Sequence, residues 1–196
     1  ELKPSHISAI AEPAIRNAPI VFMDGNASEQ VIKSACEKCD QYKVPLMVDP
    51  TSNAKSLKFV PHLKYITFLK PNEFEVVDMA NKALALNSIL AQNFGSDAVQ
   101  AHDYDTAAHV LLESGVKHVL LTRGKEGLYH YYKHKKNYEC KHYAALPVKV
   151  VKVTGAGDSF CGGFLYSIVQ GYSIDKAIHN GLRAAKAALE SEHAVN

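Results

Sequence analysis

Short apolar runs alternate with helix-like stretches along most of this chain, and that alternation limits the folds open to it. Residues 19–25, 44–50, 64–72 and 116–124 have the length and composition of buried strands. Helix-like stretches lie between them, from about Ala27 to Tyr42, from Asn72 onward and over 103–115. Because parallel strands need a long crossover, usually a helix, this order predicts an α/β fold. We expect a mostly parallel sheet with helices on both faces.

The last third of the chain carries weaker but readable patterns. GLYHYY and NYECKHYAA flank KHKKN and predict a hairpin, and VKVVKV (148–153) predicts a further strand. Two helices are expected at about 157–170 and 174–191. Residues 83–100 have the least clear pattern and are interpreted as a surface insertion.

Composition narrows the class of protein. The chain has 196 residues, 47% of them hydrophobic and 21% charged, with a net charge of +2. These values are typical of one globular domain, or of one large lobe of a domain, and give no broad electrostatic reason to expect nucleic acid or membrane partners. The first 17 residues lack both an initiator Met and the apolar core of a signal peptide. We expect a chain cut from a longer one, in the cytoplasm or an organelle matrix.

The four cysteines raise the question of metal or redox chemistry. Cys36 and Cys39 form a C-x-x-C, but they lie in an amphipathic helix that turns Val31, Ile32 and Ala35 inward. No second pair of ligands stands at zinc-site spacing, since Cys140 and Cys161 are single and distant. Reduced thiols are favoured over a zinc site or a thioredoxin-like centre.

Polar residues follow the predicted strands where each one ends. In parallel sheets these carboxyl ends meet at one edge, which is where ligands bind. Asp, Asn and Gly also end strands as ordinary turn residues, so each position alone is ambiguous. Together they outline a candidate cleft, and the residues are Asp24, Asn26, Asp49, Asn72, Thr122 and Gly124.

The stretch VKVTGAGDSFCGGF (151–164) predicts a chemical site. Gly155–Gly157 make a flexible turn into an apolar helix, and backbone amides at a helix start attract anions. Asp158 falls in the first helical turn, where the helix dipole favours its ionised form. A carboxylate beside an anion-binding turn suits phosphoryl transfer, in which it takes the proton of an attacking hydroxyl. The alternative is a common glycine turn with a capping Asp.

Other phosphate-binding motifs do not fit. The chain has no G-x-x-x-x-G-K-[ST], and no G-x-G-x-x-G follows its first strand. VTGAGDSFCGGF instead resembles the C-terminal signature of the ribokinase-like (PfkB) small-molecule kinases. Two further elements of that family follow the same order, N-x-x-E at Asn72–Glu75 and T-x-G-x-x-G at Thr122, Gly124 and Gly127.

The resemblance implies roles for these residues. Asp158 would be the catalytic base, with Gly155, Ala156 and Gly157 as the anion hole. Asn72 and Glu75 would organise Mg²⁺ and the phosphates, with Glu75 nearest the metal. ATP would contact the segment that holds Thr122, Gly124 and Gly127, and the adenine would lie near Asn180 and Arg183. ATP and Mg²⁺ are the implied cofactors.

Within the family the chain is most similar to the pseudouridine kinases, in particular the kinase part of eukaryotic pseudouridine-catabolic enzymes. The words that suggest this are FMDGN (22–26), DPTS (49–52) with Lys55, VTGAGDS, and GLRAAKAALES near the end. The resemblance implies transfer of phosphate to the 5′-hydroxyl of pseudouridine, with a fused or associated glycosidase acting next. Ribokinase-like and adenosine-kinase-like acceptors, and an inactive ATP-binding relative, stay open as alternatives.

The chain departs from the family in two ways. It resembles only the C-terminal part of the kinase domain, so residues 1–196 are expected to lack the N-terminal sugar-binding part and the lid. Many relatives also carry an Asp three residues before the first glycine of GAGD, where it helps to hold a monovalent cation. Lys152 stands there in this chain, which suggests that a monovalent cation is not required. A homodimer is a further expectation.

Overall fold

The computed structural model describes residues 2–7, 11–95 and 98–191. The chain divides into two compact units. Unit 1 holds Glu1–Arg123 and Leu128–His142, and unit 2 holds Gly124–Gly127 and Tyr143–Asn196. The predicted division of the chain into strands spaced by helices is found in unit 1.

Six strands form one sheet in the described part of the chain, in the order β1-β2-β3-β4-β5-β6. Their bounds are β1 (Val21–Asp24), β2 (Leu46–Asp49), β3 (Phe68–Leu69), β4 (His118–Thr122), β5 (Leu128–His134) and β6 (Asn137–Tyr143). β1 to β4 run parallel, and β5 runs antiparallel to β4. The predicted mostly parallel sheet and the hairpin at its end are therefore confirmed.

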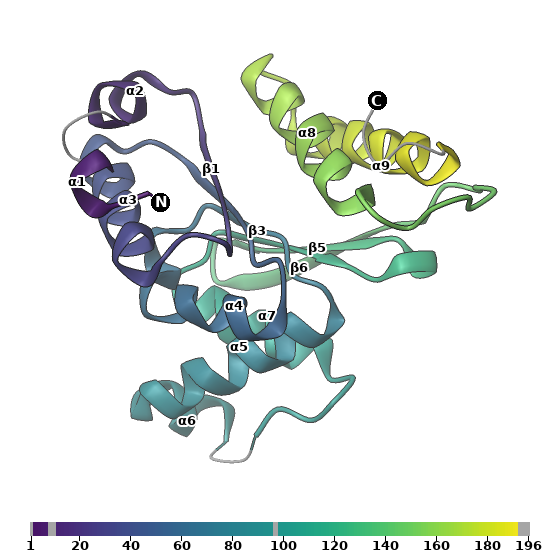
Figure 1. Ribbon diagram of the computed structural model, residues 1–196. Coiled ribbons are helices and arrows are strands. Elements are labelled where there is room, and N and C mark those ends of the chain that lie inside the picture. The colour runs from purple at the N-terminus through teal and green to yellow at the C-terminus, as the bar shows by residue number, and fades with distance from the viewer. Residues whose placement is uncertain (1, 8–10, 96–97, 192–196) are drawn as a thin grey trace. The chain divides into compact units, whose positions relative to one another are not determined.

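Three long helices supply the apolar cover of unit 1: α3 (Glu29–Tyr42), α5 (Glu73–Leu86) and α7 (Tyr104–Glu113). The Ser28 side chain accepts a hydrogen bond from the Val31 N–H and begins α3, and Lys43 ends it in a left-handed conformation. Val31, Ile32 and Ala35 are buried, as the amphipathic pattern predicts. Helices α5 and α7 pack side by side (Figure 1).

Shorter elements fill the connections. They are α1 (Pro4–His6), α2 (Glu12–Asn17), α4 (Asn53–Ser56), the 3₁₀ helix η2 (Leu57–Tyr65), α6 (Ser88–Phe94) and, in unit 2, the 3₁₀ turn η3 (Gly124–Glu126). The segment interpreted as an insertion therefore holds the end of α5 and the whole of α6.

Unit 2 is built on two helices that lie against each other, α8 (Ala156–Val169) and α9 (Ile174–Glu190) (Figure 1). Glycines set the close approach. A Cβ atom added at Gly163 would lie 2.8 Å from the Asn180 backbone oxygen, and one added at Gly181 would lie 2.8 Å from the Phe160 ring. The G-G-F part of the signature is thus a packing device as well as a motif.

The strand predicted over 148–153 is absent. Val150, Val151 and Val153 are 54%, 52% and 73% exposed, and the N–H groups of Val151 and Lys152 both donate to the Leu189 carbonyl of α9. The β-branched residues have strand propensity, but propensity without a neighbouring strand to complete the ladder does not make a strand.

The cysteines are free thiols, as predicted. Cys36 and Cys39 are buried on the inner side of α3, and burial raises the pKa of Cys36 to about 12 and that of Cys39 to about 11. Across the described residues, no group of three or more His, Cys, Asp and Glu side chains could hold a metal ion. None of the helices described has the length and apolar character needed to cross a membrane.

Candidate functional site

The carboxyl ends of the parallel strands gather acidic side chains in unit 1. Asp24 and Asp49 end β1 and β2 and are partners in the sheet register. The Lys70 ammonium lies 2.9 Å from an Asp49 carboxylate oxygen, and both side chains are almost fully buried. A buried charge needs a partner of this kind, so the pair is held firmly at the strand ends.

The N-x-x-E element begins α5. The Asn72 Oδ1 atom accepts hydrogen bonds from the Phe74 and Glu75 N–H groups, each 2.9 Å long. The Glu75 Oε2 atom accepts one from the Asn72 N–H at 2.9 Å. Together these contacts form a capping box, which closes the helix start. The spacing of the motif therefore has a structural role in addition to its expected role toward ligands.

Glu75 is a buried carboxyl group, only 3% exposed. Burial raises the pKa of Glu75, and the charge of Asp49 raises it further, while the Asn72 N–H and the Lys70 ammonium lower it. A nearby cation would stabilise the ionised form of this buried carboxylate, because its positive charge offsets the free-energy cost of removing the negative charge from water.

Thr122 lies beside Asn72. The two residues form a parallel bridge, and both the N–H and the hydroxyl of Thr122 donate to the Pro71 carbonyl, at 2.9 and 3.2 Å. The structure thus brings together two motif elements that are 50 positions apart in sequence, as the strand-end argument predicts. Arg123 follows and pairs with Glu73 at 3.2 Å.

FMDGN and DPTS also meet in unit 1. The Gly25 N–H donates to the Thr51 hydroxyl at 3.0 Å, and the Lys55 ammonium donates to the Asn26 side-chain oxygen at 2.6 Å. A Cβ atom at Gly25 would lie 2.2 Å from the Pro50 carbonyl oxygen. These two segments are therefore joined by hydrogen bonds at the ends of β1 and β2.

Gly124 and Gly127 belong to unit 2. Gly124 has a φ of 47° and Gly127 a φ of 95°, which favour glycine. A Cβ atom at Gly127 would lie 2.1 Å from the Tyr143 backbone oxygen. The glycines predicted to contact ATP are thus also required by the backbone of this turn.

The GAGD turn opens α8 in unit 2. Gly155 is the N-cap residue with a φ of 90°, and in the part of the chain that is described no side chain caps this helix start. Ala156 begins α8, and Asp158 is its third residue, with an exposed side chain. The Ala156 N–H donates to the Val153 carbonyl at 3.5 Å. Amides of a first helical turn have no partner within the helix, so those that follow can bind an anion.

Asn180 and Arg183 lie on α9. The Asn180 side-chain nitrogen donates to the Ser167 hydroxyl of α8 at 2.9 Å, so this residue ties the two helices together. Arg183 is exposed. The structure thus gives Asn180 a packing contact, and its predicted role toward adenine stays a prediction.

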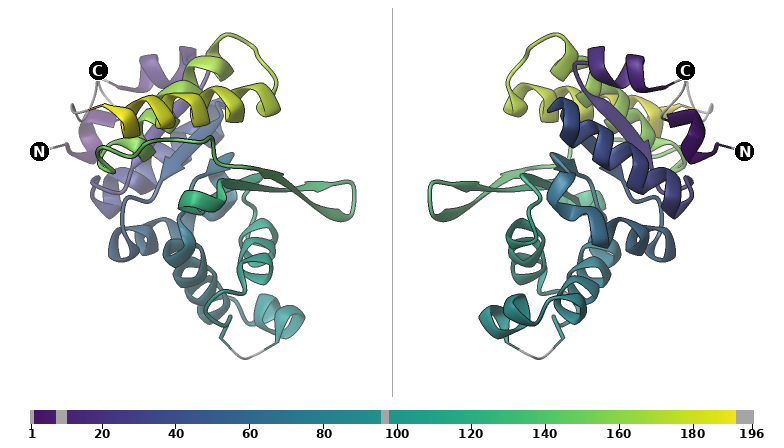
Figure 2. Two further views of the ribbon diagram at one scale, coloured as in Figure 1. Left: turned by 90° about the vertical axis from the view of Figure 1, so that its right-hand side faces the viewer. Right: turned by 90° about the vertical axis from the view of Figure 1, so that its left-hand side faces the viewer.

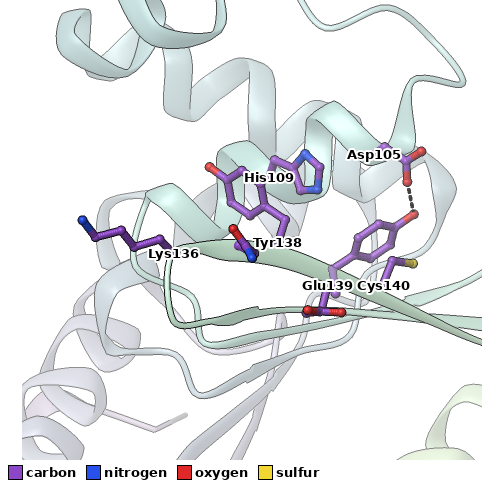
Figure 3. A pocket seen from close by; sticks show the side chains of 8 residues that line it. Asp105, His109, Lys136, Tyr138, Glu139 and Cys140 are labelled. Carbon is purple, nitrogen blue, oxygen red and sulfur yellow. Dashed lines mark hydrogen bonds between the residues drawn. The ribbon is translucent and has the colours of Figure 1, made fainter.

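Sequence reasoning missed Lys70. Its signal was a lysine at the end of an apolar strand, directly before Pro71, where a buried ion pair with Asp49 was possible. The sequence also gave no indication of a pocket of about 730 Å³, which lies between α7 and the hairpin. Figure 3 shows His109 and Tyr138 together in this pocket, and Asp105 bonded to Tyr131. The pocket shares no residue with the motifs, so we do not assign the phosphoryl chemistry to it.

Each unit, taken by itself, carries groups that suit a reaction on phosphate. Unit 2 offers a helix start without a side-chain cap beside an exposed carboxylate, and unit 1 offers two carboxylates and a lysine at the strand ends. Amides stabilise developing negative charge, and carboxylates accept protons or bind hard cations such as Mg²⁺.

Known proteins resemble the chain in sequence and in fold. It is 29% identical to a pseudouridine kinase of Arabidopsis thaliana, over 91% of this chain and 58% of that protein. It is 25% identical to a ribokinase of Bacillus subtilis, over 87% of this chain and 48% of that protein. The chain therefore spans about half the length of the curated relatives it matches.

Solved structures show the same fold. An adenosine kinase of Anopheles gambiae matches 98% of this chain and 57% of its own, with a TM-score of 0.77 and 17% identity. A ribokinase of Arabidopsis thaliana, complexed with ribose and ATP, matches 95% of this chain and 54% of its own, with a TM-score of 0.72 and 20% identity.

The family comparison covers the chain from end to end. Residues 1–196 match the family described as pfkB family carbohydrate kinase. The GAGD, N-x-x-E and T-x-G-x-x-G elements stand within that match at the positions given above. The chain belongs to the pfkB family of carbohydrate kinases.

Proposed function

We propose that the protein transfers a phosphoryl group from ATP to the 5′-hydroxyl of a nucleoside, with pseudouridine as the acceptor. The observation that carries this proposal is the start of α8, where Gly155 turns the chain and Asp158 stands exposed in the first helical turn. Residues 1–196 are proposed to be the C-terminal part of the kinase domain, and the protein to act in the cytoplasm or an organelle matrix.

The proposed chemistry divides between the two features of this turn. The Asp158 carboxylate accepts the proton of the attacking hydroxyl as the new bond to phosphorus forms. The first-turn amides of α8 donate to the oxygens of the transferred group and stabilise their charge. Because both lie in the same helical turn, their relative geometry is set by α8 itself.

The residues present fit a magnesium-bound nucleotide. Mg²⁺ prefers oxygen ligands and commonly keeps water and phosphate oxygens around it, with one or two carboxylates. Glu75 supplies a buried carboxylate at the start of α5, and Asp49 lies near enough for its charge to act on Glu75. When bound, the metal neutralises phosphate charge. Asn72, Thr122, Gly124 and Gly127 are proposed to hold the nucleotide, and Asn180 and Arg183 its adenine.

Pseudouridine is favoured as the acceptor on two grounds. The chain is 29% identical to a pseudouridine kinase over 91% of its length, and a second pseudouridine kinase, from Escherichia coli, is 25% identical over 93%. The FMDGN and DPTS words on which the resemblance rests meet at the ends of β1 and β2. A glycosidase, fused or separate, is the proposed next enzyme for the phosphorylated product.

The test is phosphate transfer by the full-length protein to pseudouridine, uridine, adenosine and ribose, measured as kcat/KM with ATP and Mg²⁺. We expect the highest kcat/KM for pseudouridine. A preference for ribose or adenosine would contradict pseudouridine as the acceptor and would leave the proposed kinase activity standing. ATP binding without transfer to any of the four would overturn the enzymatic proposal in favour of a binding role.

A further inference from the structure

Strand β6 is the last strand of the sheet and leaves one side open. The strand order ends with it, so within the described residues no strand pairs with its outer edge. Six of its seven residues are exposed, and only Tyr143 is buried. An edge strand presents a row of backbone N–H and C=O groups that can pair with another strand.

This edge is held in place from behind by α7. The Tyr138 ring stacks on His109 with their centroids 4.0 Å apart, and its hydroxyl donates to Glu113. The Tyr131 hydroxyl of β5 donates to Asp105 at 2.7 Å. Figure 3 shows His109 and Tyr138 between the hairpin and α7, and in Figure 2 the turn of the hairpin extends beyond that helix. The strand is therefore already formed and accessible.

The sequence of β6 is complementary to itself. It reads NYECKHY, and antiparallel pairing of two copies centred on Cys140 sets each residue opposite one at the same distance on the other side of Cys140. Glu139 then faces the partner's Lys141, and Tyr138 faces the partner's His142. Opposite charges directly across two strands stabilise the pairing.

Other registers lack this match. Centring the pair on Glu139 sets that carboxylate against its own copy, and centring it on Lys141 sets two ammonium groups together. A parallel pair in register sets every residue against its own copy. Like charges directly opposite each other are unfavourable, so among these arrangements the charges favour the Cys140-centred antiparallel register.

From this complementarity we propose that two copies of the protein join through their β6 strands, antiparallel and centred on Cys140, so that the two sheets become one. The interface is separate from the residues of the proposed kinase site. Dimer formation would be a function of the hairpin that none of the kinase motifs requires.

Charge reversal tests the register. Using the full-length protein, we would measure the dimer dissociation constant by analytical ultracentrifugation for the wild type, Glu139→Lys, Lys141→Glu and the double variant. Each single change makes both charge pairs repulsive and should weaken the dimer about tenfold or more. The double variant restores opposite charges and should return to within about threefold of the wild type. Lys136→Glu, in the hairpin turn, is the matched control and should change little.

Cross-linking gives an independent measurement. Cys140 is the exposed thiol, whereas Cys36, Cys39 and Cys161 are buried. A short bismaleimide should therefore link two wild-type chains through Cys140, and Cys140→Ser should abolish the product. Because burial raises the pKa of Cys140, the reaction is run at about pH 8.5. A protein that stays monomeric at high micromolar concentration would overturn the proposal. So would a dimer that neither cross-links at Cys140 nor responds to charge reversal.

Discussion

At the scale of single residues, Asp158 is the side chain on which the proposed chemistry depends. Asp158→Asn keeps the size of the side chain and removes its ability to take a proton, so we expect turnover to fall by about 10²–10⁴ while ATP affinity changes little. Steady-state kinetics and nucleotide titration on the full-length protein give the two numbers. Asp175→Asn, in the first turn of α9, is the matched control. If both changes lowered turnover only slightly and equally, Asp158 would have no catalytic role and would only stabilise the helix start.

Lys152 stands where the family resemblance leads us to expect an Asp. It is exposed, and its N–H donates to the Leu189 carbonyl at 3.3 Å, which ties its backbone to α9. A lysine ammonium near the anion-binding turn can supply the positive charge that a bound K⁺ would otherwise give. We therefore expect turnover to be the same when K⁺ is replaced by a large organic cation, and to fall in Lys152→Met. Strong activation of the wild type by K⁺ would return Lys152 to an ordinary surface role.

At the scale of elements, the contact between α8 and α9 can be tested with two adjacent glycines. A Cβ atom at Gly163 would lie 2.8 Å from the Asn180 carbonyl oxygen and 3.0 Å from the Ala184 Cβ, whereas one at Gly162 would meet nothing within 4 Å. Gly163→Ala should lower the free energy of unfolding by about 1–3 kcal/mol. Gly162→Ala should raise it by up to about 1 kcal/mol, because alanine is the better helix former. Urea denaturation measures both, and equal effects would contradict the close contact.

The pairing of β4 with β5 carries a pH dependence. The His118 Nδ1 and His130 Nε2 atoms are 3.0 Å apart, and the His118 ring stacks on Phe68. Burial, with a smaller effect of Lys117, lowers the pKa of His118 from 6.5 to about 4. The unfolded chain therefore binds the proton first, and the free energy of unfolding should fall by about 2–3 kcal/mol as the pH drops through that window.

The measurement is urea denaturation between pH 7 and pH 4. His118→Gln removes the titrating group and keeps an amide that can bond to His130, so its stability should depend less on pH than that of the wild type. His134→Gln, at the exposed end of β5, is the control and should behave like the wild type. Identical pH profiles for all three proteins would show that His118 does not control this dependence.

Elements were predictable where one local signal dominated. Helix α3 has both a capping serine and a clear apolar side, and β1, β2 and β4 are apolar runs that end in polar residues. The helical segment from α4 through η2 was missed, because Pro50 stands before it and Pro61 inside it, and prolines indicate breaks. The strand predicted for VKVVKV was wrong for the opposite reason. The local strand propensity was strong, but the backbone N–H groups of Val151 and Lys152 donate to a carbonyl of α9 instead of to a neighbouring strand.

At the scale of the whole molecule, the sequence indicated candidate site residues but not most of the contacts between them. The meeting of Asn72 with Thr122 follows from the rule that parallel strands end at one edge. The buried pair of Lys70 and Asp49 depends on which side chains the neighbouring strands bury, and no short motif encodes that. The bond between Asn180 and Ser167 likewise depends on how α8 and α9 pack.

The length of the chain, compared with that of its relatives, leads to a prediction at this scale. The chain spans about half of its curated relatives, and the resemblance assigns to it the nucleotide-binding residues but not the substrate lid. We expect residues 1–196 alone to bind ATP with Mg²⁺ in calorimetry and to phosphorylate nucleosides far more slowly than the roughly 1–100 s⁻¹ common for kinases, because nothing orders the acceptor or excludes water. Turnover within that range from these residues alone would contradict the assignment of the substrate-binding part to residues outside them.

The two glycines between α8 and α9 also differ in how they can change over generations. Every amino acid other than glycine carries a Cβ atom, so any replacement at either position meets the facing helix. At Gly181 the two nearest atoms, both at 2.8 Å, belong to the Phe160 ring, which an earlier mutation to a smaller side chain could remove, leaving the Phe160 backbone oxygen at 3.0 Å. At Gly163 the nearest atom is the backbone oxygen of Asn180, which every residue has. A compensating mutation at Phe160 therefore lowers the barrier to exchanging Gly181, so that a shift of a few tenths of an ångström is enough, while Gly163 can be exchanged only if the helices themselves move apart.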